Sequence, residues 1–295
     1  MDGRSLAQQI KSKIKRQLNA VKASNVDPKL VTILVGDNPA SKAYLKNTHE
    51  TASEVGIRSS NLELSAATSQ VELERTIEKL NSDVTVTGIL LQLPLPSALS
   101  DVSAICRISR EKDVDGLNPF NLGLLTQKDA KIAPCTPRGV IVLLKNYGVQ
   151  TAGQHAVLIN RTRLVGRPLA QLLLNEDATV TICHSKTQNL RSITRQADIL
   201  LTGIGRRSEF TVGPDMIKPG ATIIDIGTSS VGGKLMGDVD FEAALNVASL
   251  ITPVPGGVGP MTNAMLLYNT LLTACLQKGV VMELTLNELS AAVPH

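Results

Sequence analysis

Apolar residues near the start of the chain recur every three or four positions. They are Leu6, Ile10, Ile14, Leu18 and Val21. Residues with this spacing lie on one face of an α-helix, so the pattern predicts an amphipathic helix over residues 4–22. The same reasoning predicts helices over 41–55 and 71–81. Gly56 follows the first of these directly, where a glycine commonly ends a helix.

Two other runs in this region are short, apolar and rich in β-branched residues. They are LVTILVG (30–36) and VTVTGILLQLPLP (84–96), and the second runs into a proline-rich loop. Such runs are typical of strands that are buried on both faces of a parallel sheet. Strands that alternate with helices predict an α/β fold.

The alternation starts again in the second half of the chain. Buried strands are predicted at 155–160, 178–183, 197–203 and 221–227, with helices at 165–176 and 189–197. This is the size and order of a nucleotide-binding α/β unit. Residues 261–289 are apolar and periodic, and we expect them to form helices that pack back on the first unit. The predicted domains are therefore 1–137 with 263–295, and 138–262.

Composition excludes several classes of protein. The chain has 295 residues, 43% hydrophobic and 19% charged, which is too apolar for a disordered protein. Its net charge of +4 is spread out rather than gathered in a basic run, so we expect no nucleic-acid partner. No segment has the length of a membrane span and the N-terminus lacks an apolar signal region, so a cytoplasmic location without a membrane partner is expected. The four cysteines lie far apart and are expected to be reduced, and no metal site is predicted.

Polar turns follow the first two strands of the second unit. Asn160, Arg161 and Thr162 precede a predicted helix, whose N-terminal N–H groups suit a phosphate, and a guanidinium can bind a phosphate through two hydrogen bonds. The turn after the next strand carries Ser185 and Lys186 with no acid, where dinucleotide-binding folds contact the adenosine ribose. This favours NADP over NAD, although two ordinary polar loops would have the same composition.

Two further motifs could carry chemistry. The stretch 253–262 (PVPGGVGPMT) combines prolines with three glycines, which favours a ligand loop lined by backbone over a plain linker. The stretch 112–119 (KDVDGLNP) contains Asp115 before a glycine. Asp115 could turn or cap the chain, or it could accept a hydrogen bond from a ring N–H of a ligand.

Together these motifs resemble the methylenetetrahydrofolate dehydrogenase/cyclohydrolase family. The matching segments are VGDNPAS (35–41), LLQLPLP (90–96), KDVDGLNP (112–119), PCTPRGV (134–140), ATVTICHSKT (178–187) and TPVPGGVGPMTNAML (252–266). The resemblance implies an α/β fold with an N-terminal folate domain, a Rossmann-like nucleotide domain, a folate cleft between them and a homodimer formed through the nucleotide domain. It implies tetrahydrofolate contacts at Tyr44, Gln92, Leu93, Asp115, Pro255, Gly256, Gly257, Val258 and Gly259, with Tyr44, Gln92 and Asp115 catalytic. It implies NADP contacts at Asn160, Arg161, Thr162, Ser185 and Thr228, with Arg161 and Ser185 at the positions of the family residues that hold the NADP 2′-phosphate.

Three departures from the family pattern bear on function. The turn Asn160-Arg161-Thr162 replaces Gly-Arg-Ser, and Gly227-Thr228-Ser229 replaces Gly-Ile-Asn. The third lies four residues after Tyr44, on the same helix face, where the family has the lysine that handles protons in the cyclohydrolase step and this chain has Thr48.

The loss of that lysine affects only one of the family's two reactions. Hydride transfer to the nicotinamide requires alignment, with no protein acid or base in the hydride step. Hydrolysis of the methenyl group requires proton transfer, which a threonine hydroxyl cannot provide near neutral pH. We therefore expect a dehydrogenase with lost or weak cyclohydrolase activity. The alternatives are a bifunctional enzyme in which His49 or an ordered water substitutes, and a folate- or nucleotide-binding protein without turnover. His49 is offset by about 100° around the helix and is expected to be a solvent-exposed surface residue.

Overall fold

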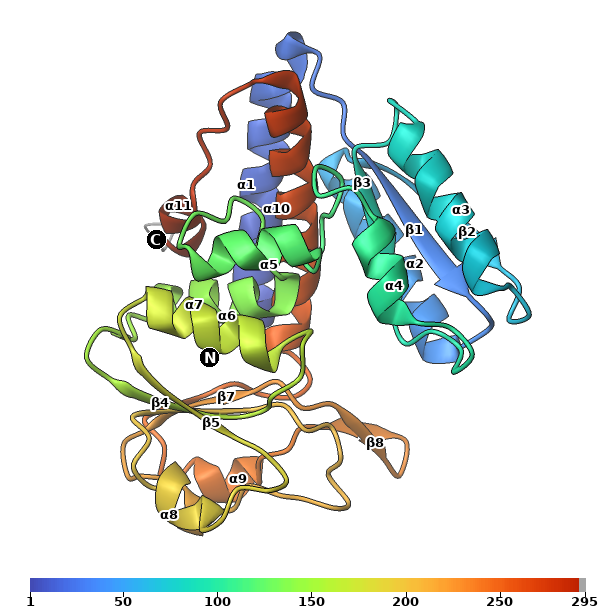
Figure 1. Cartoon of the computed structure of the whole chain (residues 1–295). Helices are drawn as coiled ribbons and strands as arrows, with labels where there is room; N and C mark the ends of the chain where they lie inside the picture. The colour runs from blue at the N-terminus through green and yellow to red at the C-terminus, as the bar shows by residue number, and fades with distance from the viewer. Residues whose placement is uncertain (292–295) are drawn as a thin grey trace. The chain divides into compact units, whose positions relative to one another are not determined.

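Parallel strands and connecting helices build two separate sheets in this chain, as the apolar runs predict. The computed structural model describes residues 1–291 (Figure 1). Its residues divide into two units: Met1–Gln9, Pro134–Met265 and 286–291 form unit 1, and Ile10–Ala133 with Leu266–Thr285 form unit 2. The domain limits predicted from the sequence differ from these ranges and stay a prediction. No helix of the described chain is long and apolar enough to span a bilayer.

Unit 2 contains a three-stranded parallel sheet in the order β2-β1-β3. Its strands are β1 (Lys29–Val35), β2 (Arg58–Leu64) and β3 (Gly88–Leu91). The predicted strands at 30–36 and 84–96 correspond to β1 and, in a shorter form, to β3. Strand β2 was not predicted, because its residues RSSNLEL form no apolar run and are mostly exposed or half-buried at the sheet edge.

Several helices complete unit 2, among them α2 (Pro39–Val55), which packs on β1 and β2. The others are α3 (Gln70–Ser82), α4 (Asp101–Arg107) and α5 (Pro119–Thr126), with a short 3₁₀ segment η1 (Lys22–Ser24). The Asn38 side chain caps the start of α2, and Gly56 ends it with a φ of 90°, which confirms the predicted C-cap. Ser69 and Glu72 form a capping box at the start of α3.

Two long helices have residues in both units. They are α1 (Gly3–Val21) and α10 (Val258–Lys278). Inside unit 2, the fully buried Asn269 of α10 donates to the carbonyls of Val114 and Ala133 at 2.9 and 3.0 Å. Gln277 donates to the carbonyls of Thr87 and Glu111. The prediction that helices within 261–289 pack back on the first half of the chain is thus confirmed for residues 266–285, and it was wrong for 261–265 and 286–289, which belong to unit 1.

Unit 1 is built on a five-stranded parallel sheet in the order β10-β7-β6-β4-β5. Its strands are β4 (His155–Ile159), β5 (Thr179–Cys183), β6 (Ile199–Thr202), β7 (Thr222–Asp225) and β10 (Leu250–Ile251). Four of the five were predicted. The prediction that all four are buried was wrong for β5, which lies at the sheet edge and has mostly exposed or half-buried residues.

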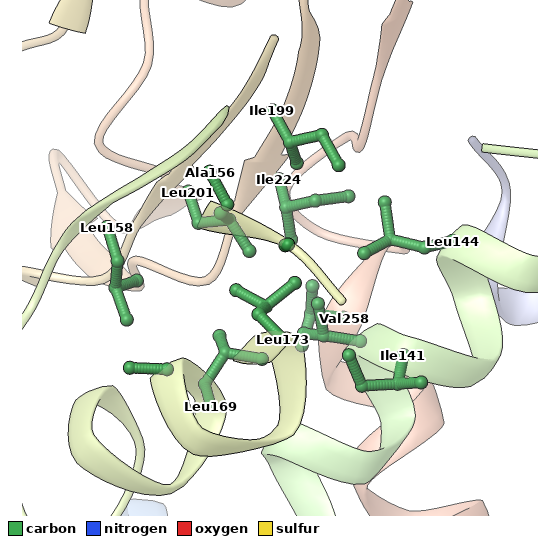
Figure 2. Packing of buried hydrophobic residues seen from close by; sticks show 13 residues of the cluster. Ile141, Leu144, Ala156, Leu158, Leu169, Leu173, Ile199, Leu201, Ile224 and Val258 are labelled. Atoms are coloured by element: carbon green, nitrogen blue, oxygen red, sulfur yellow. The ribbon is translucent and has the colours of Figure 1, made fainter. Parts of the chain in front are cut away.

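Helices cover both faces of this sheet (Figure 1). One face packs on α6 (Cys135–Asn146) and α7 (Gly166–Asn175), and α11 (Leu286–Ser290) packs on α6. Figure 2 shows Leu169 and Leu173 of α7 and Ile141 and Leu144 of α6 facing the apolar side chains of the sheet. The other face carries α8 (Leu190–Thr194), α9 (Phe241–Ala244) and η2 (Pro214–Met216). The predicted helix over 189–197 is therefore shorter than expected.

A two-stranded antiparallel hairpin follows β7 in the chain. It consists of β8 (Ser229–Val231) and β9 (Lys234–Met236). Its turn residues Gly232 and Gly233 both have positive φ, at 57° and 77°, which glycine adopts at no steric cost. Neither strand was predicted.

Candidate functional site

A pocket of about 530 Å³ opens at the carboxyl ends of β4, β5 and β6. In the sheet, β5 lies on one side of β4 and β6 on the other, so the strand order reverses at β4. Open α/β sheets bind ligands at such a reversal. Four of the five predicted cofactor contacts line this pocket: Asn160, Arg161, Thr162 and Ser185. The two turns selected from the sequence therefore lie around one pocket, and their contact with NADP stays a prediction.

Asn160 connects two walls of the pocket. Its side chain is 8% exposed, accepts a hydrogen bond from the Thr162 N–H at 2.7 Å and donates to the Gly203 carbonyl at 2.5 Å. It thereby links the turn after β4 to the segment after β6. The asparagine that replaces the family glycine thus has a structural role in this chain, because its side chain bonds two segments of the pocket wall to each other.

Thr162 organises the start of α7. Its hydroxyl accepts from the backbone N–H groups of Val165 and Gly166, both at 3.3 Å. Gly166 has to be a glycine, because a Cβ there would lie 2.4 Å from the Asn160 carbonyl oxygen. Arg161 is exposed on the pocket rim. The turn therefore presents a guanidinium beside a helix N-terminus, which is a favourable arrangement for a phosphate.

The turn after β5 also lines this pocket. The His184 N–H donates to the Thr187 hydroxyl at 2.9 Å, and His184 Nδ1 accepts from the Lys186 N–H at 3.1 Å. Ser185 and Lys186 are exposed. Cys183 at the strand end is fully buried and burial raises the pKa of its thiol, as expected for a small apolar residue rather than a nucleophile.

Sequence reasoning missed one cation of this pocket. Arg206, in the segment after β6, also lines it and forms an exposed ion pair with Glu209 at 3.4 Å. Arg206 and Glu209 lie in the stretch GRRSEF (205–210). No motif in this stretch distinguishes Arg206 from the neighbouring Arg207.

A second pocket of unit 1, of about 450 Å³, is lined by residues 255–259 of the PGGVG loop. Thr228, the fifth predicted cofactor contact, lies here together with Arg4, Thr136 and Thr262. The hydroxyls of Thr136 and Thr262 are 2.9 Å apart. Gly256 has a φ of 116°, and a Cβ on Gly257 would lie 2.7 Å from the Pro253 carbonyl oxygen. The loop thus lines a pocket with its backbone, as its glycines predict.

The remaining predicted folate contacts belong to unit 2. Tyr44 is half-buried on α2. Thr48, one turn later, is completely buried, and its hydroxyl donates to the Tyr44 carbonyl at 3.0 Å. This is the common i to i−4 bond of a threonine inside a helix. The Thr48 hydroxyl is therefore bonded to its own helix backbone.

His49 is not the exposed surface residue that we expected. Its ring is half-buried between α2 and the sheet, with Nε2 3.0 Å from the Thr32 hydroxyl and Nδ1 2.8 Å from the Ser59 hydroxyl. The Thr32 hydroxyl donates to Asn61 Oδ1 at 2.8 Å, so Nε2 is the nitrogen that donates to Thr32. Burial lowers the pKa of His49, which favours the neutral ring.

Gln92, Leu93 and Asp115 are half-buried at the ends of two neighbouring segments. Gln92 follows β3, its N–H donates to the Ile33 carbonyl, and its side-chain amide donates to the Leu93 carbonyl at 2.7 Å. Asp115 lies in the DVDG turn next to Gly116, which has a φ of 73°.

The carboxylate that holds the DVDG turn is Asp113, which the sequence analysis did not select. It is 2% exposed and accepts from the N–H groups of Gly116, Leu117 and Asn118 at 3.0, 3.2 and 2.8 Å. It also accepts from the Asn121 side chain at 2.8 Å. Because Asp113 provides the turn-forming bonds, the Asp115 carboxylate is not required for them. Within residues 1–291 no group of three His, Cys, Asp or Glu side chains could hold a metal ion.

Comparison with known proteins agrees with this geometry. Residues 1–115 match the catalytic-domain model of the tetrahydrofolate dehydrogenase/cyclohydrolase family, and residues 134–278 match its NAD(P)-binding domain model. The chain is 48% identical over 280 residues to the bifunctional protein FolD of Nitrosopumilus maritimus, covering 95% of this chain and 98% of that protein.

Solved structures are similar over nearly the whole chain. The bifunctional FolD enzyme of Campylobacter jejuni has 43% identity and a TM-score of 0.90, with 94% of this chain and 98% of that chain covered. The FolD of Trypanosoma brucei, solved with NADP cofactor and an inhibitor, has 37% identity and a TM-score of 0.88, with 94% and 97% covered. On the sequence and structural matches together, this chain belongs to the tetrahydrofolate dehydrogenase/cyclohydrolase family.

Proposed function

We propose that this chain is a 5,10-methylenetetrahydrofolate dehydrogenase that uses NADP, forms 5,10-methenyltetrahydrofolate and has little or no cyclohydrolase activity. The observation that carries the proposal is the state of Thr48, which is buried and bonded to the Tyr44 carbonyl at the position of the family lysine. The two reactions of the family differ in their need for that lysine.

The residues of the first pocket fit NADP. Arg161 and the N-terminus of α7 suit phosphate groups, and Ser185 contributes a hydroxyl to the pocket. The cation Lys186 follows Ser185 in a turn that contains no acid. When bound, NADP accepts a hydride at its nicotinamide ring. The chain's own part is to bind and orient the reactants, and Asn160 keeps the turns after β4 and β6 in register for this.

For the folate we propose contacts at Tyr44, Gln92, Leu93 and Asp115 of unit 2 and at residues 255–259 of unit 1. Gln92 is oriented by its bond to the Leu93 carbonyl, and Asp115 by the turn that Asp113 holds. A carboxylate at Asp115 can accept a ring N–H of the pterin and so fix its face. Hydride transfer requires this alignment, which can contribute several kcal/mol to lowering the barrier, and it requires no proton donor.

Hydrolysis of the methenyl product does require proton transfer. A positioned acid or base contributes on the order of 10² to 10⁴-fold, and a threonine hydroxyl cannot titrate near neutral pH. His49 is a poor substitute, because both ring nitrogens are engaged by Thr32 and Ser59 on the sheet side of α2. These contacts favour loss of the cyclohydrolase step over its rescue by the neighbouring histidine.

A bifunctional enzyme is the second candidate. It is favoured by relatives with 46–48% identity that are named bifunctional FolD. It requires another group than Thr48 to move the proton: an ordered water, or His49 after release from its bonds to Thr32 and Ser59. A homodimer and a cytoplasmic location complete the proposal, and light scattering of the purified protein would test the dimer.

The test is to restore the lysine. We expect Thr48→Lys to clear the methenyl product at least about tenfold faster than the wild type, towards the 10² to 10⁴-fold range of a positioned acid or base. Thr51→Lys is the matched control. Thr51 is also buried in α2 and also donates to the carbonyl four residues earlier, Asn47, at 2.7 Å, but its Cα lies about 4.5 Å further along the helix axis and is rotated by about 60° from position 48.

Both variants insert a long side chain at a buried position, which costs about 1–3 kcal/mol of stability. Folding is therefore checked by circular dichroism and by retained dehydrogenase activity. A folded, active Thr48→Lys enzyme that hydrolyses the methenyl product no faster than the Thr51→Lys control would contradict the assignment of position 48.

A further inference from the structure

Two buried aspartates lie at the carboxyl edge of the five-stranded sheet, outside the motifs that indicated the function. Asp225 ends β7 and Asp238 follows β9, and they are 3% and 0% exposed. Together they accept six hydrogen bonds within unit 1, five from backbone N–H groups and one from a hydroxyl. Burial of a carboxylate is costly, so this arrangement calls for a physical reason.

Asp238 holds the segment that follows β6. Its Oδ2 accepts from the Thr202 hydroxyl at 2.9 Å and from the Ile204 N–H at 2.6 Å, and its Oδ1 accepts from the Gly205 N–H at 2.9 Å. Ile204 lines the first pocket, between Gly203 and Arg206 of the same wall. The position of that wall is therefore fixed by a side chain 33–36 residues further along the chain.

Asp225 holds the segment after β7 and the backbone of Asp238 itself. Its Oδ1 accepts from the N–H groups of Gly227 and Asp238 at 2.9 and 3.0 Å, and its Oδ2 accepts from Val239 at 2.8 Å. Asp225 and Gly227 line the second pocket. The two aspartates thus act in series: Asp225 positions Asp238, and Asp238 positions the wall of the first pocket.

The surroundings leave these carboxylates little freedom. A Cβ on Gly227 would collide with the Asp238 carboxyl group, and a Cβ on Gly237 would collide with that of Asp225. An amide could not replace either carboxylate without loss, because an amide has one acceptor oxygen and each aspartate uses both of its oxygens here. Burial, with the nearby charge of Asp238 as a smaller cause, raises the pKa of Asp225 to about 6.

We propose that Asp225 and Asp238 are positioning residues for dinucleotide binding, which hold the walls of the two pockets of unit 1 in fixed register. The inference rests on the proposed function in one respect, that the first pocket binds a dinucleotide. The affinity for a dinucleotide then depends on the hydrogen bonds of Asp225 and Asp238, although neither carboxylate binds the ligand.

The experiment measures NADPH binding by its fluorescence, without turnover, at a temperature where circular dichroism shows each variant folded. Asp238→Asn is expected to weaken NADPH binding at least tenfold and Asp225→Asn at least fivefold. In the double variant the combined loss is expected to be smaller than the product of the two, because residues in one bond chain are not additive. Asp198→Asn is the matched control. Asp198 precedes β6 at the opposite edge of the sheet, where it pairs with Lys218, and its variant is expected to bind within twofold of the wild type.

Each result decides one point. If the wild type does not bind NADPH, the proposed function fails. If the wild type binds and Asp238→Asn binds equally well, or if Asp198→Asn loses as much affinity, the positioning role is overturned. Should Asp238→Asn fail to fold, Thr202→Val removes one of its three bonds and is expected to weaken binding two- to fivefold, and unchanged binding in that variant would overturn the inference.

Discussion

Replacement of Asp113 by asparagine should destabilise the DVDG turn, which carries the proposed folate contact Asp115. The carboxylate accepts four hydrogen bonds while 2% exposed, two on each oxygen. Asparagine keeps one acceptor oxygen and places an NH₂ group at the other. The N–H of Asn118 and the side-chain amide of Asn121 would then face a donor instead of an acceptor.

The magnitude follows from those two donors. A buried donor without a partner costs about 1–3 kcal/mol, so two of them cost about 2–6 kcal/mol. Burial raises the pKa of Asp113, so removal of its charge returns part of this cost. We therefore expect a loss of about 2–4 kcal/mol, a large share of the roughly 5–15 kcal/mol that stabilises a typical domain.

Urea unfolding at pH 7.5 measures the loss, and the KM for methylenetetrahydrofolate reports on Asp115, which lies in the same turn. We expect a raised KM, because Asp115 is positioned by the bonds of Asp113. Asp129→Asn is the control: Asp129 is exposed in the same unit and pairs weakly with Lys131 at 3.9 Å, so its variant should stay within about 0.5 kcal/mol of the wild type. If Asp113→Asn also stayed within about 0.5 kcal/mol of the wild type in its free energy of unfolding, the idea that this carboxylate holds the turn would be refuted.

Three further predictions concern cofactor choice and pH. Arg161→Ala should raise the KM for NADP at least tenfold and leave the KM for NAD nearly unchanged, because only NADP carries the 2′-phosphate. Equal effects on both cofactors would show that Arg161 does not bind the 2′-phosphate. Because the folded pKa of Asp225, about 6, lies above its unfolded value of 3.8, its contribution to the free energy of unfolding should rise as pH falls from about 7 towards 4, and this rise should be absent in Asp225→Asn. The lowered pKa of His49 acts in the opposite direction: its contribution should fall as pH drops below about 6.5, a trend that His49→Gln should abolish in urea titrations across that range.

The sequence predicted the elements whose signals are local. Buried central strands such as β1, β4 and β6 are apolar runs, and Gly56 ends a helix as its type suggests. The sheet edges were harder. The polar strand β2 was missed and β5 was taken as buried, because apolar periodicity does not encode which strand lies at an edge.

The candidate site divides in the same way. Arg161 and Ser185 were accessible to sequence reasoning because each lies in a short turn directly after a strand. Asp113 was missed because the Asp-Gly pair drew attention to Asp115, whereas the bonds that hold the turn run from Asp113 to residues three to eight positions ahead. The Thr202–Asp238 bond spans 36 residues, and no local pattern contains such a pair.

The most direct test of the central claim follows the wild-type protein with 5,10-methylenetetrahydrofolate and NADP, with NADPH and the methenyl product measured separately against an enzyme-free hydrolysis control. The account predicts that NADPH forms while the methenyl product accumulates and decays no faster than in the control. Formation of NADPH with methenyl decay clearly faster than the control would contradict the claim that the cyclohydrolase step is lost, and absence of NADPH formation would contradict the dehydrogenase itself.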